Sequence, residues 1–253
     1  MSEIAVLVQN YNKTEEAKAL AHRLSLSVLF EESDEFDLYL CFGEEGLFLM
    51  GEGTRVMGDF SNALRRLKPA NLNGEMLVKA SGIKKLAKKG KTSPPLAIDA
   101  TAGLGEDSLL LAAAGFHVIM FERDPVIAAL LRDAIHRAKF HPELEAIMER
   151  MELHEGDSIS EMRKLSEGGT HPELVLLDPM FPGRSKSGLV KKKFQLIHGL
   201  EEPCKDEEEL FAAAKALKPL RIIVKRPLKG PFLAMEKPGF SIQGKTIRYD
   251  GYI

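Results

Sequence analysis

From Leu96 onward, short apolar runs alternate with stretches of helical spacing. A short apolar run bounded by turn residues predicts a buried strand, and apolar residues at about every third or fourth position predict an amphipathic helix. The predicted strands are 96–101, 117–123, 151–155, 173–178 and 221–226, and the predicted helices are 107–114, 126–140, 158–165 and 207–218. Regular alternation of this kind is typical of a parallel sheet with right-handed crossovers. Two last apolar runs, 240–245 and 246–252, predict an antiparallel hairpin at the end of the chain.

The first 72 residues have a different pattern. Apolar runs predict strands at 4–9, 28–30, 36–42 and 46–51, and helical spacing predicts a helix at 14–26. Thr14 is the expected N-cap of that helix. The last two strands flank Gly43-Glu-Glu-Gly46, which predicts a hairpin. We therefore predict a small α+β N-terminal domain of residues 1–72, followed by an α/β domain of residues 73–253.

Composition places the chain among ordinary globular proteins. With 44% hydrophobic and 28% charged residues in 253, it can bury a substantial core. No signal peptide and no long apolar span are evident, so we expect a cytoplasmic protein that does not contact a membrane. Cys41 and Cys204 lie far apart, which argues against a disulfide framework. Neither the cysteines nor the histidines have metal-ligand spacing, so we expect no metal.

The stretch 98–107 joins a predicted strand to a predicted helix through a glycine turn. Gly103 and Gly105 allow a sharp bend and a close approach to a ligand, and the helix start presents unpaired N–H groups. The third glycine of a dinucleotide fingerprint is missing, and Glu106 and Asp107 stand in its place. These carboxylates would repel a pyrophosphate but suit a ligand with hydroxyls and a cationic group, such as S-adenosylmethionine. The alternative is a glycine turn that binds nothing.

Acidic residues stand at the carboxyl ends of the first three strands of this domain. Asp99 ends the first and would face the methionine part of the ligand. Glu122 ends the second, about 20 residues after the glycine turn, where a carboxylate can accept from both ribose hydroxyls; Arg123 beside it joins the cofactor-binding set. Asp157 and Ser158 follow the third strand and are candidates for the adenine amino group, for the N-cap of the next helix, or for both. The alternative for Glu122 is a solvated acid.

A fourth predicted strand ends in Asp178-Pro-Met-Phe181. Pro179 has no N–H and a fixed φ, which leaves the Asp178 carboxylate and nearby carbonyls free to accept from an amino group. Phe181 can stack on a flat ring. Acceptors beside an aromatic side chain describe a site for the exocyclic amine of a base, with Asp178, Pro179 and Phe181 as catalytic residues and Asp178 also next to the cofactor. The alternative is a proline-rich loop with Phe181 in the core.

The net charge of −2 does not exclude an RNA partner, because the charges are segregated. Basic residues gather at 84–91, at 184–193 and at 225–229, and the second cluster directly follows the Asp178 motif. The residues assigned to RNA binding from that cluster are Arg184, Lys186, Lys191 and Lys192. Any one cluster is explained by a solvated helix face or a linker, but three together favour phosphate binding and an RNA partner.

Three stretches of the chain together resemble the RsmJ family, bacterial enzymes that methylate guanine N2 in small-subunit (16S) ribosomal RNA. The matching stretches are 99–105, 121–126 with 128–131, and 177–182 with 186–192. The resemblance extends from about Asn73 to the C-terminus and is weak before Gly51. It implies a Rossmann-like class I methyltransferase sheet that uses S-adenosylmethionine, with a helix over 74–84 beside the cofactor. The chain departs from the family pattern at Glu106, where the family has arginine.

The sequence therefore predicts a methyltransferase that acts on an amino group of RNA. The resemblance narrows the substrate to guanine N2 of ribosomal RNA, free or in the small subunit. Alternatives left open are the same fold acting on DNA adenine or protein glutamine, a nucleotide-cofactor oxidoreductase, and a non-catalytic RNA-binding module. The missing third glycine counts against the oxidoreductase, and the intact Asp178 motif counts against a pure binder. The sequence indicates neither the target nucleotide nor the oligomeric state.

Overall fold

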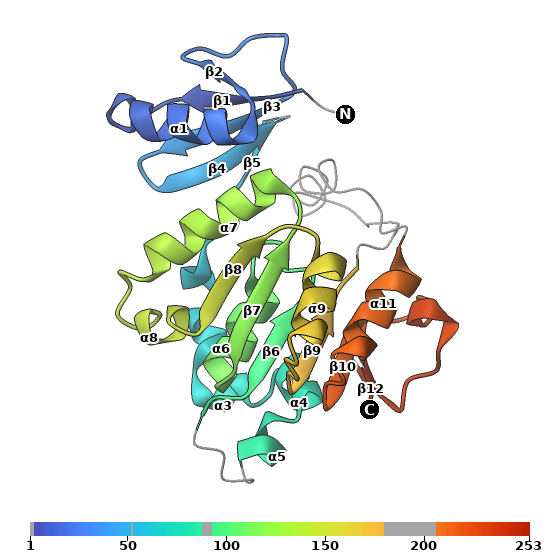
Figure 1. Cartoon of the computed structure of the whole chain (residues 1–253). Coiled ribbons are helices and arrows are strands. Elements are labelled where there is room, and N and C mark those ends of the chain that lie inside the picture. The colour runs from blue at the N-terminus through green and yellow to red at the C-terminus, as the bar shows by residue number, and fades with distance from the viewer. Residues whose placement is uncertain (1–2, 52, 88–92, 180–205) are drawn as a thin grey trace.

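The strands of this protein form two separate sheets. The computed structural model describes residues 3–51, 53–87, 93–179 and 206–253, and within them one sheet has five strands and the other seven. Figure 1 shows the five-stranded sheet at the top, above the larger α/β unit. The predicted α/β fold with a mainly parallel sheet is confirmed.

The larger sheet has the strand order β11-β12-β10-β9-β6-β7-β8. Its strands are β6 (Leu96–Asp99), β7 (His117–Glu122), β8 (Met151–Glu155), β9 (Leu174–Leu177), β10 (Arg221–Pro227), β11 (Phe240–Gln243) and β12 (Ile247–Tyr252). The strands from β6 to β10 pair in parallel, while β12 runs antiparallel to both β10 and β11. Each strand predicted after residue 96 is therefore present, with its ends within two residues of the prediction.

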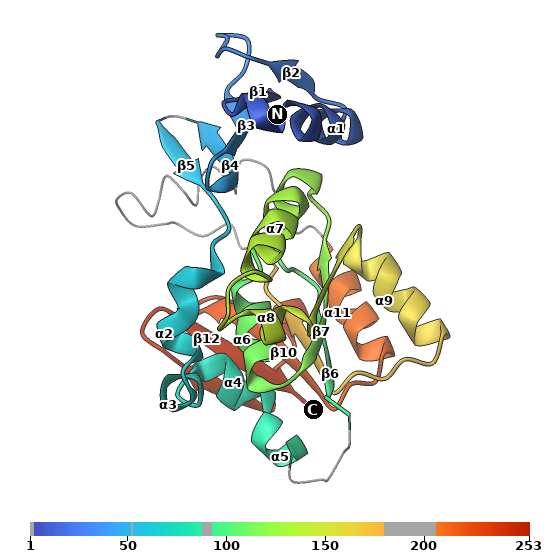
Figure 2. The same cartoon turned by 90° about the vertical axis from the view of Figure 1, so that its left-hand side faces the viewer.

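Helices cover both faces of this sheet (Figures 1 and 2). One face carries α4 (Met76–Ser81), α6 (Glu106–Ala114), α7 (Pro125–Ala138) and α8 (Glu145–Met148), and the other carries α9 (Ser158–Glu167) and α11 (Glu207–Ala216). Side chains alternate between the two cores: Leu174 and Leu176 of β9 pack on the first face, and Val175 and Leu177 pack on the second. A strand covered on both sides needs an apolar residue at every position, which explains the unbroken apolar run of β9.

The smaller sheet has the strand order β2-β1-β3-β4-β5. Its elements are β1 (Ile4–Val8), α1 (Thr14–Leu24), β2 (Ser27–Leu29), β3 (Leu38–Gly43), β4 (Gly46–Gly51) and β5 (Thr54–Val56). β1 pairs in parallel with β2 and β3, and β3 and β4 form the predicted hairpin. The short strand β5 was not predicted, because three residues are too few to show a period.

Helix α7 lies between the two sheets, as Figure 1 shows. Its Val126, Ala129 and Leu130 pack with the core of the smaller sheet, while Leu131 and Ala134 pack with the core of the larger one. A helix buried on two sides needs apolar residues around most of its circumference, and nine of its fourteen residues are buried.

The segment that joins the two sheets packs mainly with the larger one. It contains a 3₁₀ turn (Phe60–Ala63) and two short helices, α2 (Leu64–Leu67) and α3 (Pro69–Leu72). Phe60 and Leu72 are buried in the same core as α6. The domain boundary that we predict after residue 72 stays a prediction.

Two predicted details of the helices are wrong. Thr14 is the first residue of α1 rather than its N-cap; Lys13 takes that place, and the Thr14 hydroxyl donates to the Tyr11 carbonyl at 2.7 Å. The helix predicted over 74–84 is broken into α4 and α5 (Ile83–Ala87) by Gly82, whose φ of 72° ends α4. Helix α4 packs on α6, β11 and β12, so it supports the helix that begins at the site described below.

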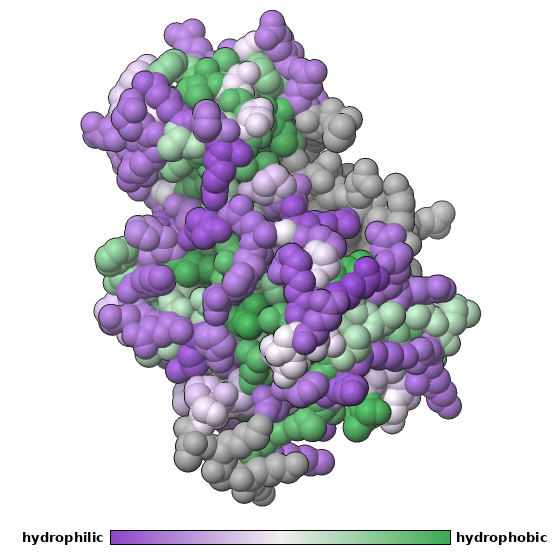
Figure 3. Space-filling view, viewed as in Figure 1, coloured by the Kyte–Doolittle hydropathy of each residue, from purple (hydrophilic) through white to green (hydrophobic). Residues whose placement is uncertain are grey.

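No helix in the described part of the chain is long and apolar enough to cross a membrane. On the face seen in Figure 3, hydrophilic side chains cover most of the surface, and hydrophobic ones form smaller patches on both the N-terminal unit at the top and the larger unit below it.

Candidate functional site

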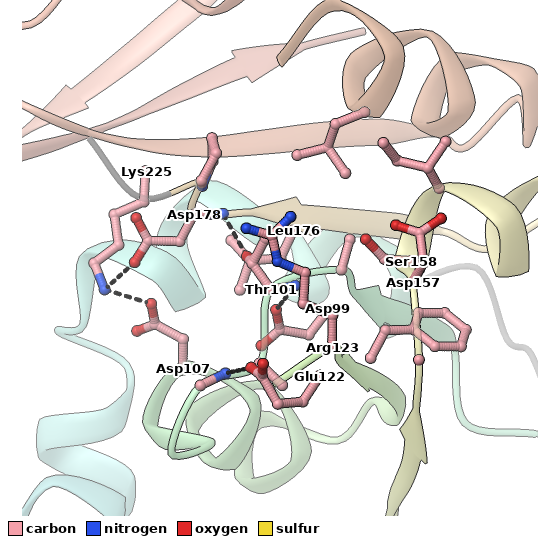
Figure 4. A pocket seen from close by; sticks show the side chains of 18 of the residues that line it. Asp99, Thr101, Asp107, Glu122, Arg123, Asp157, Ser158, Leu176, Asp178 and Lys225 are labelled. Atoms are coloured by element: carbon pink, nitrogen blue, oxygen red, sulfur yellow. Dashed lines mark hydrogen bonds and ion pairs between the residues drawn. The ribbon is translucent and has the colours of Figure 1, made fainter. Parts of the chain in front are cut away.

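A cavity of about 350 Å³ opens at the carboxyl edge of the larger sheet, where parallel strands of α/β proteins bind ligands. In Figure 4, Lys225, Asp178 and Asp107 lie at one end of the cavity, and Asp157 and Ser158 lie at the other. The predicted site residues that line it are Asp99, Gly103, Glu106, Asp107, Glu122, Arg123, Asp157, Ser158, Asp178 and Pro179. The structure thus brings together residues from the carboxyl ends of four different strands.

The glycine turn is shaped by two residues with left-handed backbone. Gly103 has a φ of 54°, and Gly105, with a φ of 79°, is the N-cap of α6. A Cβ atom on Gly105 would lie 2.6 Å from Leu131 Cδ1 and 3.2 Å from Phe60 Cζ, whereas a Cβ on Gly103 would meet no atom within 4 Å. Gly105 therefore packs against the core and does not line the cavity, while Gly103 does.

We expect Gly105→Ala to lower the free energy of unfolding by about 2–4 kcal/mol. Left-handed backbone costs a residue with a Cβ about 1–2 kcal/mol, and crowding in a packed core adds roughly 1–3 kcal/mol. Gly103→Ala has only the cost of the left-handed backbone, so its free energy of unfolding should fall by only about 1–2 kcal/mol. Urea unfolding of both variants measures the difference, and equal losses would contradict the role of packing at Gly105.

Asp99 is buried at the end of β6, with 2% of its surface exposed. Its carboxylate accepts from the Ser108 hydroxyl at 2.6 Å and from the Thr101 N–H at 3.1 Å, which fixes it between β6 and the start of α6. Burial raises the pKa of Asp99 to about 7, although these hydrogen bonds oppose the shift. The neighbouring carboxylates of Asp107 and Asp178 also raise it, so a cationic ligand here would favour the ionised form.

Glu122 is held rigidly at the end of β7. Its two carboxylate oxygens accept from the Gly103 N–H and the Asp124 N–H, each at 2.8 Å, and 5% of the residue is exposed. Burial raises the pKa of Glu122, against the effect of the two backbone donors. Each oxygen keeps a second lone pair for a ligand hydroxyl. Arg123 lines the cavity beside it, so both predicted positions are in place.

Asp157 serves as the N-cap of α9, since its carboxylate accepts from the Ser160 N–H at 2.9 Å. Asp157 and Ser158 both line the cavity as well. The structural role that the sequence offered for Asp157 is therefore confirmed, and it is compatible with a ligand contact at the same place.

Lys225 joins two carboxylates at the opposite end of the cavity (Figure 4). Its ammonium lies 2.8 Å from Asp107 Oδ2 and 3.0 Å from Asp178 Oδ2. The Tyr249 hydroxyl donates to the other oxygen of Asp107 at 3.4 Å. The Asp178 side chain is 41% exposed, against 26% for Lys225 and 16% for Asp107, so Asp178 is the member of the trio most open to a ligand.

The charges of this trio depend on one another. Burial alone would lower the pKa of Lys225, but the carboxylates of Asp178 and Asp107 raise it above its ordinary value. Loss of water raises the pKa of Asp178, and the Lys225 ammonium opposes that shift. Lys225 therefore stays charged and favours the ionised form of Asp178.

The Asp178–Pro179 segment is tied to the glycine turn. The Asp178 N–H donates to the Thr101 hydroxyl at 2.7 Å, and Pro179 is buried at the cavity wall. The loop that follows β9 is thus anchored to the loop that follows β6. The predictions for Phe181, Arg184, Lys186, Lys191 and Lys192 lie outside the described residues.

Two of the three residues of the third basic cluster predicted from the sequence, Lys225 and Arg226, do not lie on the surface. Arg226 is 1% exposed, and its guanidinium donates to both carboxylate oxygens of Glu207 at 3.0 Å. Lys225 lies inside the cavity, and only Lys229 is exposed. Residues that are consecutive in a strand point to opposite faces, and β10 is an internal strand of the sheet.

The charge of the cavity is strongly acidic. Among the described residues, the lining includes seven acidic side chains and two basic ones: Asp99, Glu106, Asp107, Glu122, Asp157, Asp178 and Asp206, against Arg123 and Lys225. Such a lining repels phosphate groups and attracts a cation. Leu104, Phe121 and Ile159 add apolar surface, so the cavity suits a ligand that has a flat apolar part, hydroxyls and a positive charge.

Lys225, Thr101 and Tyr249 were missed as site residues in the sequence. The only signal for Lys225 is a charge at the end of an otherwise apolar strand, 222–225, and we assigned that charge to the surface. Its true place follows from the strand order, in which β10 lies beside β9 and so brings Lys225 next to Asp178.

No group of three or more histidine, cysteine, aspartate or glutamate residues in the described ranges is arranged to hold a metal ion.

Comparison with known proteins gives a consistent picture. A family model described as a putative SAM-dependent methyltransferase matches residues 19–253. Ribosomal RNA small subunit methyltransferase J of Pseudomonas aeruginosa strain PAO1 is 40% identical over 244 residues, 94% of this chain and 90% of the relative. The protein of the same name from Dechloromonas aromatica is 40% identical and covers 93% of this chain and 94% of its own length. A crystal structure of a SAM-dependent methyltransferase from Neisseria gonorrhoeae aligns with a TM-score of 0.76 at 30% identity, over 98% of this chain and 95% of that one.

Proposed function

The chain belongs to the RsmJ family of S-adenosylmethionine-dependent methyltransferases, and we propose that it methylates the N2 amino group of a guanosine in small-subunit ribosomal RNA. The relatives' name supplies the class of RNA. The observation that carries the proposal is the acid-lined cavity that ends at Asp178 and Pro179, because it offers a place for a cationic cofactor directly beside acceptors for an amine.

The residues that line the cavity fit S-adenosylmethionine. When bound, this cofactor supplies a methyl group activated by a positively charged sulfur. We assign Glu122 to the ribose hydroxyls, because both of its oxygens are fixed by backbone donors and each can accept once more. Asp157 and Ser158 are placed for the adenine amino group, and Asp99 for the ammonium of the methionine part. The acidic lining also favours the sulfonium charge.

The amine end of the reaction is assigned to Asp178 and Pro179. The Asp178 carboxylate accepts a hydrogen bond from the guanine amine, and the backbone carbonyl of the Pro179 region accepts a second. These bonds orient the nitrogen lone pair toward the methyl group, so alignment and fixed charge supply most of the acceleration. As the nitrogen takes up the methyl group, the bond from that methyl group to sulfur would break, and the Asp178 carboxylate stabilises the positive charge that develops on the nitrogen. The nitrogen would then release its extra proton to solvent. Phe181, predicted to stack on the base, completes the proposed catalytic set.

Lys225 has a positioning role in this proposal. It holds Asp178 in one orientation through a 3.0 Å contact and is itself fixed by Asp107. The ammonium also favours the ionised carboxylate, which is the form that accepts from an amine.

We expect Glu122→Gln to weaken S-adenosylmethionine binding about 10- to 100-fold, with turnover at saturating cofactor changed far less. A glutamine has one oxygen and one NH₂ group, so its NH₂ group would face one of the two backbone N–H donors without a hydrogen bond. Hydrogen bonds to charged groups contribute about 1.5–3 kcal/mol, which sets the size of the expected loss. Calorimetry gives the dissociation constant. Glu155→Gln is the matched control: Glu155 ends β8, pairs with Arg23 and Arg132, and lies outside the cavity. An unchanged constant for Glu122→Gln would remove Glu122 from the ribose site.

The direct test is transfer of labelled methyl from S-adenosylmethionine to small ribosomal subunits purified from cells that lack this gene. Nuclease digestion and mass spectrometry should then identify N2-methylguanosine. The same assay is carried out in parallel with free 16S ribosomal RNA, duplex DNA and a protein substrate. Label in DNA or protein, with none in either form of ribosomal RNA, would contradict the proposal. Because the substrate is ribosomal RNA, we also propose a cytoplasmic site of action.

A further inference from the structure

Four exposed cations lie on segments that pack beside one another next to the end of β10. They are Arg65, Lys68, Lys229 and Lys245, from the segment around α2, the loop after β10 and the turn before β12. In the part of the chain that the structure describes, none of the four forms an ion pair with a carboxylate. They are therefore available to an anionic partner.

These four residues belong to one continuous surface, although they are far apart in the sequence. The Arg66 guanidinium donates to both Glu75 oxygens at 2.9 and 3.1 Å, which fixes α2 against the residue before α4. Met76, the next residue, packs on the turn before β12, since a Cβ on Gly244 would lie 2.7 Å from its Cε. Thr246 in that turn accepts from the Leu228 N–H at 2.9 Å, which ties in the loop that carries Lys229. Figure 2 shows α2 and α4 on the side of the sheet where β12 lies.

This surface borders the end of the cavity where we place the amine. Lys229 follows Lys225 by four residues as β10 leaves the cavity. On the other side, the turn that leads into α2 packs on the glycine turn, since a Cβ on Gly105 would lie 3.2 Å from Phe60 Cζ. The segment around α2 therefore lies beside the start of α6, which carries Asp107, a member of the Lys225 trio.

We infer that Arg65, Lys68, Lys229 and Lys245 form a phosphate-binding strip that holds the RNA backbone next to the target nucleotide. The cavity repels phosphates through its seven acidic side chains, so the backbone has to remain at the rim while the base enters. Exposed lysines and arginines that are not neutralised by the protein are the groups that bind phosphates and release counterions. A base in a paired region has to be flipped out before it reaches Asp178, and contacts to the flanking phosphates hold the strand during that step. This inference rests on the proposed function.

The test compares two triple variants with the same change in charge. The strip variant carries Lys68→Gln, Lys229→Gln and Lys245→Gln. The control variant carries Lys139→Gln, Lys218→Gln and Lys237→Gln, three exposed lysines from other parts of the surface that likewise form no ion pair in the described part of the chain. Affinity for 16S ribosomal RNA is measured by filter binding at several salt concentrations, methyl transfer is measured on small subunits, and calorimetry with S-adenosylmethionine verifies that both variants are folded.

We expect the strip variant to bind RNA about tenfold or more weakly. The slope of its plot of log affinity against log salt concentration should decrease in magnitude by about 2. The control variant should stay within about twofold, and S-adenosylmethionine affinity should be the same in all three proteins. Equal losses in the two variants, or no loss in the strip variant, would overturn the inference. A wild-type protein that neither binds nor methylates ribosomal RNA would instead refute the proposed function, so the two failures are distinguishable.

Discussion

Replacement of Asp178 with alanine should lower the rate of methyl transfer about 10²- to 10⁴-fold, while S-adenosylmethionine affinity changes less than about tenfold. Asp178 is the most exposed member of the Lys225 trio, and its backbone N–H is fixed by Thr101. The carboxylate is therefore presented to the cavity from a backbone position that Thr101 fixes. The variant keeps the loop but loses the acceptor that orients the amine, so the loss should fall on turnover.

Single-turnover kinetics at saturating cofactor, with calorimetry for the cofactor, separates these two effects. Asp178→Asn keeps the shape of the side chain and one oxygen, so it should be impaired less than the alanine variant. Asp206→Asn is the control, because Asp206 is an exposed acid that also lines the cavity but forms no ion pair with Lys225 in the described part of the chain. A rate within tenfold of wild type for Asp178→Ala would exclude the proposed role.

Lys225→Met should lower turnover about 10- to 100-fold at neutral pH and make it depend on pH. Without the ammonium, the carboxylates of Asp178 and Asp107 repel each other, and the loss of a cation partner raises a carboxyl pKa. Loss of water already raises the pKa of Asp178, and Lys225 opposes that shift. A carboxyl is protonated below its pKa, so the variant should require a higher pH than wild type to reach its full activity.

The pH profile of turnover distinguishes this role from a purely structural one. Lys225→Arg keeps the charge and should restore most of the activity with the pH profile of wild type. Misfolding would lower activity at every pH without changing the shape of the curve. A Lys225→Met profile parallel to wild type would therefore contradict the assignment of Lys225 as the residue that keeps Asp178 ionised.

Residues next to strand ends were predictable because short-range chemistry specifies them. A glycine turn needs Gly105 at a left-handed position packed against the core, and an acid at a strand end, such as Glu122, is placed by the period of the strand. The same reasoning gave the strands of the larger sheet and the hairpin that ends the chain. These features depend on a few neighbouring residues and leave a readable pattern.

Contacts across the sheet were not predictable in the same way. The pairing of Lys225 with Asp178 and Asp107 requires the knowledge that β10 lies beside β9. The burial of Arg226 depends on Glu207, at the start of α11. The prediction that the basic residues at 225–229 share one surface is therefore wrong, because neighbouring residues of a strand point to opposite faces of the sheet. The predictions for Phe181 and for the basic residues after it stay predictions.

The position of helix α7 has a consequence for the evolution of this architecture. One side of the helix completes the core of the N-terminal sheet, the other side completes the core of the larger one, and its first turn follows Glu122 and the Asp124 cap. A truncated chain without the first sheet would present an apolar helix face to water and loosen the segment next to Glu122. The N-terminal unit can therefore change during evolution, but its loss would also require substitutions on the outer face of α7.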